Sequence, residues 1–82
     1  MTTPLQDAQE GIRLLKAAIC RLLQDNPDGL NTSQIGEQLG INFANRKYKA
    51  FMPYYLLNEL EEEQKVIGHG GKGRKGKIYR LA

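Results

Sequence analysis

Basic residues are concentrated in the last fifteen positions of the chain. Five of the nine residues in 68–76 are glycine, and residues 68–82 contain no acid. Glycine lets the backbone lie close to a sugar-phosphate surface, and lysine and arginine neutralise phosphates. The cations of this segment are Lys72, Arg74, Lys75, Lys77 and Arg80. The segment therefore has the chemistry of a phosphate-binding surface.

Two further groups have side chains suited to nucleic acid. Residues 45–49 supply donors for base edges or phosphates, and residues 32–34 lie at the start of a predicted helix, where free amides hold anions. A solvated helix start, a solvated hairpin tip and simple helix capping are the alternatives. The candidate nucleic-acid-binding residues are Thr32, Ser33, Gln34, Asn45, Arg46, Lys47, Tyr48, Lys49, His69, Lys72, Arg74, Lys75 and Lys77.

Three helices are predicted ahead of the basic segment. Apolar residues recur every three or four positions over residues 5–24, and the turn formers Asp25–Gly29 end that helix. A second helix is expected over 32–39, capped by Asn31 or Thr32 and stopped by Gly40. The third covers about 45–64, and Pro53 predicts that it is kinked there or begins properly at the proline.

A hairpin is predicted to follow the helices. Residues 65–68 and 77–81 are short runs with β-branched and aromatic side chains, and the glycine-rich segment separates them. The acidic cluster Glu59, Glu61, Glu62 and Glu63 is expected to be a solvated face that repels DNA from the wrong side. The expected fold class is α+β, with three helices followed by a two-stranded antiparallel wing over about 65–81.

Length and composition favour one domain spanning residues 1–82. The 82 residues are 40% hydrophobic and carry a net charge of +3. A chain of this size forms one modest core. The single cysteine, Cys20, lies in the apolar pattern of the first helix and is expected to be a buried small hydrophobe, which suits a reducing cytoplasm.

The sequence resembles the winged-helix superfamily of generic bacterial type. Residues 29–40 resemble the helix-turn-helix element of many bacterial regulators, and residues 57–67 resemble the end of their recognition helix and the entry to the wing. The resemblance implies a cytoplasmic DNA-binding regulator or accessory protein that places its third helix in the major groove and its wing on the backbone. It covers about residues 5–82.

Two alternatives stay open. Phe43, Arg46, Lys47, Tyr48 and the run 77–81 resemble the LOTUS domain, a winged-helix variant associated with RNA and helicase partners. In the other alternative, Met52, Tyr54 and Tyr55 form a protein-interaction surface and the wing is incidental. A homodimer is also compatible with the chain, since one small domain covers only a half-site of DNA.

Several function classes find no support in the sequence. Catalysis needs a base, a nucleophile and an orienting group, whereas the only histidine, His69, lies in the glycine-rich tip. One Cys and one His cannot build a closed zinc site, so no metal or cofactor is expected. No stretch approaches the roughly 18 apolar residues of a membrane span, and no signal peptide is recognised.

Overall fold

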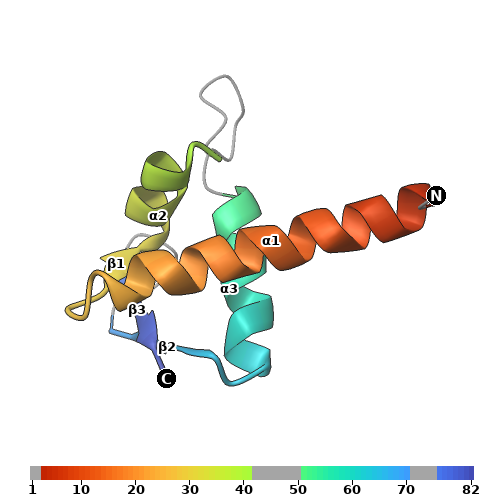
Figure 1. The fold of residues 1–82 in the computed structure, drawn as a ribbon. Helices are drawn as coiled ribbons and strands as arrows, with labels where there is room; N and C mark the ends of the chain where they lie inside the picture. Colours follow the sequence, from red (N-terminus) through yellow and green to blue (C-terminus); the bar gives the residue numbers. More distant parts are fainter. Residues whose placement is uncertain (1–2, 42–50, 71–75) are drawn as a thin grey trace.

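The computed structural model describes residues 3–41, 51–70 and 76–82. Three helices and three short strands follow one another in the order α1, β1, α2, α3, β2, β3 (Figure 1). Their bounds are α1 Pro4–Gln24, β1 Leu30–Asn31, α2 Thr32–Leu39, α3 Phe51–Glu62, β2 Val66–His69 and β3 Ile78–Leu81. The predicted α+β class with three helices and antiparallel strands is confirmed.

The sheet has three strands, whereas the sequence predicts only the two strands of the wing. β3 is the central strand, and both β1 and β2 pair with it antiparallel. The register aligns Leu30 with Tyr79 on one side and Gly68 with Tyr79 on the other. The additional strand is β1. The sequence predicts its two residues as the entry to the second helix, because a pair of residues beside a helix cap is too short to show the alternating pattern of a strand.

Local sequence signals explain where the first two helices begin and end. Thr3 and Gln6 form a capping box at α1, with Pro4 in the first turn. Asn31 and Gln34 form a second capping box at α2, which ends at the left-handed Gly40 as predicted. Asn31 rather than Thr32 is therefore the capping residue.

The third helix ends at a recognisable signal. Pro53 lies within α3, two residues after Phe51, and the part of this helix predicted over residues 45–50 lies outside the described residues. The helix ends two residues earlier than predicted, because Gln64 adopts a left-handed φ of 62°. The Lys65 N–H donates to the Leu60 carbonyl at 2.9 Å across this turn.

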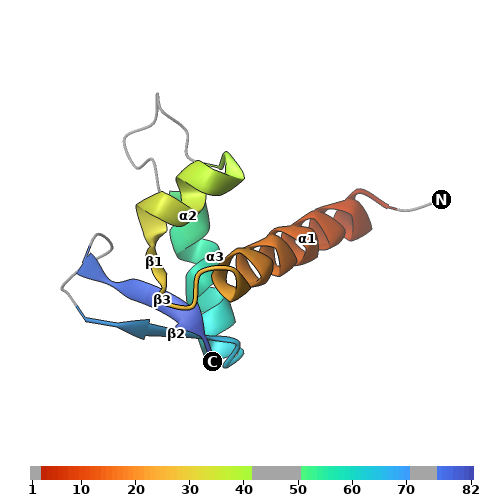
Figure 2. The same ribbon diagram turned by 60° about the vertical axis from the view of Figure 1, so that its left-hand side comes forward.

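The core lies where α1, α2 and α3 meet one face of the sheet. Its buried hydrophobic members are Ile19, Leu23, Leu30, Ile35, Leu56, Leu57, Leu60, Val66 and Tyr79. Every helix and strand supplies at least one of them, so no single element is dispensable. α1 continues past this core to one side, while the sheet lies toward the other (Figure 2). None of the helices in the described ranges combines the length and apolar character needed to cross a membrane.

Gly29 is the turn residue that brings β1 onto β3, and its substitution should cost far more than that of Gly40. Both have positive φ, +91° and +70°. A Cβ at Gly29 would lie 2.5 Å from Ile78 Cγ2 and 2.9 Å from the Tyr79 carbonyl oxygen, whereas no described atom lies within 4 Å at Gly40. Gly40→Ala should cost about 1–2 kcal/mol from backbone strain. Gly29→Ala should add about 1–3 kcal/mol of overpacking.

Urea unfolding of the two variants measures this difference. Equal losses of unfolding free energy would show that the close approach of Gly29 to β3 is not a constraint on the fold.

Candidate nucleic-acid interface

Two exposed basic side chains lie on the outer face of the β2–β3 hairpin. The register pairs Ile67 with Arg80 and His69 with Ile78. Alternate residues of a strand point to opposite faces, and Tyr79 points into the core, so Arg80 and His69 share the outward face. His69 and Arg80 both border a shallow hollow of about 370 Å³. Arg80 has no ion-pair partner among the described residues.

Lys77 fastens the hairpin to α3. Its Nζ lies 3.1 Å from Glu61 Oε1 and 5.3 Å from the centre of the Tyr79 ring, within cation–π range. The hydrogen bond to Glu61 raises the pKa of Lys77, against a smaller opposing effect of burial. Gly68 leaves space for this lysine, because a Cβ at that position would overlap Lys77 Cε. The predicted phosphate contact at Lys77 therefore competes with an internal ion pair.

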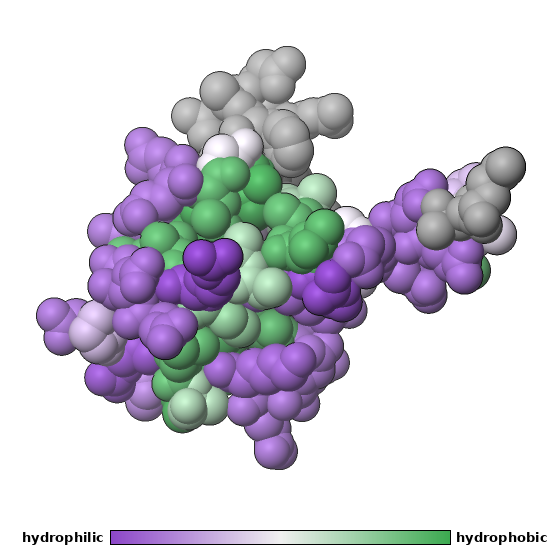
Figure 3. Space-filling model, viewed as in Figure 1, coloured by the Kyte–Doolittle hydropathy of each residue, from purple (hydrophilic) through white to green (hydrophobic). Residues whose placement is uncertain are grey.

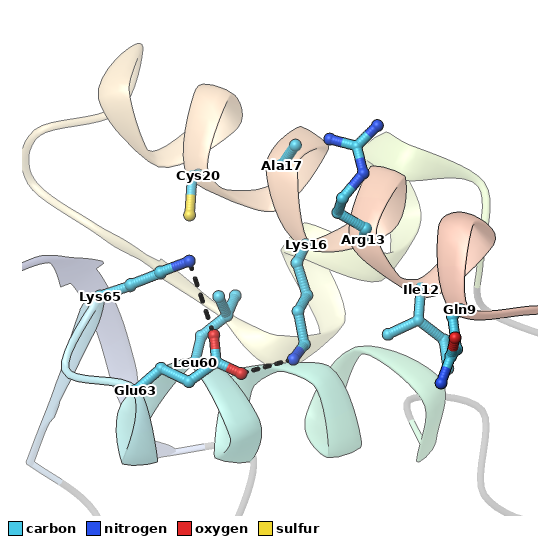
Figure 4. A pocket seen from close by; sticks show the side chains of 9 residues that line it. All are labelled: Gln9, Ile12, Arg13, Lys16, Ala17, Cys20, Leu60, Glu63 and Lys65. Atoms are coloured by element: carbon cyan, nitrogen blue, oxygen red, sulfur yellow. Dashed lines mark hydrogen bonds and ion pairs between the residues drawn. The ribbon is translucent and has the colours of Figure 1, made fainter. Parts of the chain in front are cut away.

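Three of the four acids of the cluster, Glu59, Glu61 and Glu63, are engaged in ion pairs, which corrects the expectation of a solvated face for them. Lys16 Nζ lies 2.6 Å from Glu63 Oε2 and 3.0 Å from Glu59 Oε1, and Lys65 Nζ lies 3.7 Å from Glu63 Oε1. Figure 4 shows Lys16 and Lys65 converging on Glu63 from either side. The cluster thus joins α3 to α1 and to the start of β2.

These ion pairs shift the titration of both partners. The hydrogen bond from Lys16 lowers the pKa of Glu63, and the hydrogen bond to Glu63 raises the pKa of Lys16. Burial raises the pKa of the nearby Cys20 thiol, which is partly buried rather than fully buried as expected. A thiol with a raised pKa is a poor nucleophile.

The amino end of α2 offers less to a ligand than its sequence indicates. Thr32 is only 1% exposed, so its hydroxyl does not face solvent. Gln34 Oε1 accepts the Asn31 N–H at 2.9 Å, which uses this side chain in the capping box. Ser33 is half-buried. Capping and packing therefore account for Thr32 and Gln34.

The structure brings together only part of the predicted interface. Asn45, Arg46, Lys47, Tyr48, Lys49, Lys72, Arg74 and Lys75 lie outside the described residues. Of the rest, His69 and Lys77 lie on the hairpin, whereas Thr32, Ser33 and Gln34 lie on α2. Arg80 was missed as a site residue, because the alternation of the predicted strand places it on the same face as Ile78 but does not say which face is buried.

Comparisons with known proteins give the chain no family. No protein-family model, no curated protein and no solved structure matches it. Within the described ranges, no group of three or more His, Cys, Asp or Glu side chains could hold a metal ion.

The Lys16–Glu63 pair should make stability depend on pH. A carboxyl whose pKa is lowered in the folded state from its ordinary 4.5 contributes stability that is present above that value. This stability is lost as the pH falls through the lower folded-state pKa. Glu63→Gln should therefore be less stable than the parent at neutral pH and equal to it in acid.

Glu62→Gln is the matched control, because Glu62 is exposed and has no ion pair among the described residues. Thermal unfolding followed from neutral to acidic pH gives the readout. A stability deficit of Glu63→Gln that persists unchanged in acid would contradict the assigned role.

Proposed function

We propose that this chain is a single winged-helix domain that binds duplex DNA and serves as a small cytoplasmic regulator of transcription or an accessory protein. The start of its third helix would enter the major groove, and the basic β2–β3 hairpin would act as the wing on the backbone. The element order with β3 between β1 and β2 fits this fold and supports the proposal. α2 followed by α3 supplies the helix-turn-helix.

The observation that carries the proposal is the distribution of unpaired charge. Lys16, Lys65 and Lys77 are matched by acids at the end of α3 or directly after it. Arg21 on α1 and Arg80 on β3 have no ion pair among the described residues. Of these two, Arg80 shares its face with His69 and lies next to a sequence segment that holds three further cations and no acid. Positive potential is therefore left at the hairpin end of the molecule, where a phosphate backbone would gain most from it.

The protein-interaction alternative receives less support from α3. Tyr55 is 46% exposed, but its hydroxyl donates to Glu59 Oε2 at 3.2 Å. Met52 is packed against the core and Tyr54 is half-buried. A continuous aromatic surface for a partner is therefore not formed by these residues, whereas the charge on the hairpin would be unexplained in a pure interaction module.

Salt-dependent binding to duplex DNA is the expected outcome. The affinity should fall linearly on a log–log plot against salt, with a slope of about −0.9 for each phosphate neutralised. Arg80→Gln should weaken binding to all sequences alike and reduce the slope by about one. The triple change of Lys72, Arg74 and Lys75 to Ala should reduce it further, whereas Arg46→Ala or Asn45→Ala should mainly alter sequence preference.

Arg21→Gln is the matched control, since Arg21 is exposed on α1 and is not part of the β2–β3 hairpin. Fluorescence anisotropy with labelled duplex DNA, single-stranded DNA and structured RNA at several salt concentrations gives the affinities. Tighter binding of RNA would favour the LOTUS-like alternative, and no binding to any of the three would reject a nucleic-acid function.

A further inference from the structure

Lys77 and Arg80 are cations of the hairpin that face opposite sides of the sheet. Tyr79 is fully buried against the helices, and Lys77 lies two residues before it, on the same face of an extended chain. The Lys77 Nζ lies 5.3 Å from the centre of the Tyr79 ring, which agrees with this facing. Arg80 is exposed on the outer face. A ligand on the outer face would therefore meet Arg80 and not Lys77.

The inner face holds Lys77 through both oxygens of one carboxylate. Its Nζ donates to Glu61 Oε1 at 3.1 Å and to Oε2 at 3.2 Å. The side chains of Lys77 and Glu61 are 31% and 32% exposed, against 65% and 53% for the Arg13–Glu10 pair on α1. Charges that are partly withdrawn from water are screened less than exposed ones. The Lys77–Glu61 pair is therefore the more persistent of the two.

The sequence of β2 leaves room for this pair. Gly68 is the β2 partner of Tyr79, and a Cβ there would overlap Lys77 Cε, so any other residue would force the lysine to move. The aliphatic stem of Lys77 thus takes the place of a side chain that Gly68 does not contribute to the inner face. Glycine at this position, lysine at 77 and glutamate at 61 form one arrangement.

The Lys77–Glu61 pair lies where the pairing of the two strands stops. The last β2–β3 pair is His69 with Ile78, and Lys77 is the next residue outside it. Figure 2 shows β2 and β3 extending away from the end of α3. A two-stranded ribbon is only marginally stable without packing against another element. The pair therefore ties the far end of the hairpin back to α3.

We propose that the Lys77–Glu61 pair positions the hairpin for DNA and that Lys77 itself contacts no phosphate. The inference rests on the proposed function, in which the cations between His69 and Lys77 in the sequence meet the backbone. Fixing the point at which this segment leaves the sheet lowers the ordering cost that binding must overcome. Lys77 is thus a positioning residue that acts through Glu61.

The sign of the effect at Glu61 distinguishes positioning from charge. An acid near a DNA surface repels phosphates, so the loss of its charge alone should tighten binding. If Glu61 holds the hairpin, Glu61→Gln should instead weaken binding. Glu62→Gln is the matched control, because Glu62 is the exposed neighbouring acid and has no ion pair among the described residues. The space-filling view shows hydrophilic residues around the end of α3, so both changes alter a polar surface (Figure 3).

Fluorescence anisotropy with labelled duplex DNA tests the proposal. Glu61→Gln should lower the affinity about three- to tenfold, whereas Glu62→Gln should leave it unchanged or raise it slightly. Lys77→Gln should weaken binding in the parent and have little further effect in the Glu61→Gln background, because the two residues act as one unit. A phosphate contact would cost the same in both backgrounds and reduce the salt slope by about one. That result would overturn the proposal.

Hydrogen exchange of the β2 and β3 amides without DNA separates failure of the pair from failure of the proposed function. Exchange should be faster in Glu61→Gln and Lys77→Gln than in the parent, with Glu62→Gln like the parent. Exchange in Glu61→Gln equal to that in Glu62→Gln, or equal DNA affinities of the two, would overturn the positioning role. A parent that binds no duplex would reject the proposed function and with it this role, even where exchange shows that the pair holds the hairpin.

Discussion

Burial of Tyr79 at the centre of β3 is the contact on which the rest of the structure depends. Its side chain is fully buried, and its backbone lies between β1 and β2. The ring fills space that the three helices leave against the sheet, and burial raises the pKa of its hydroxyl more than the nearby Lys77 lowers it. Because β1 and β3 are far apart in the sequence, the sheet cannot close until β3 reaches the strand that follows Gly29.

The acids of α3 organise the charges of the molecule around this core. They hold α1 through Lys16 and the hairpin through Lys77, so a cluster of like charge becomes a junction between three elements. Such exposed pairs contribute little free energy one by one. Their greater effect is on where positive charge remains, because the lysines that they neutralise no longer attract an anionic ligand. The excess of positive charge lies in the hairpin segment, where residues 68–82 contain no acid.

Local sequence patterns predicted the helices and the hairpin, whereas the contacts between residues distant in sequence could not be predicted from them. The three-and-four spacing in 5–24 gave α1 almost to the residue, and capping residues with Gly40 gave α2. β1 was missed because its two residues become a strand only by pairing with β3. The pairing of Lys77 with Glu61 joins residues sixteen positions apart, and no local pattern distinguishes it from a free lysine in a basic run. Arg80 was overlooked for the opposite reason, since its run of charge ended in a strand whose facing only the register fixes.

The exposed half of α1 and the β2–β3 hairpin are separated in space. They lie on opposite sides of the helical core (Figure 2). Residues 3–10 are all exposed, and the buried members of α1 are Ile19 and Leu23, which lie in its second half. A ligand bound on the hairpin would therefore leave the first half of α1 uncovered, and substitutions at residues 3–10 should affect neither the core nor the hairpin.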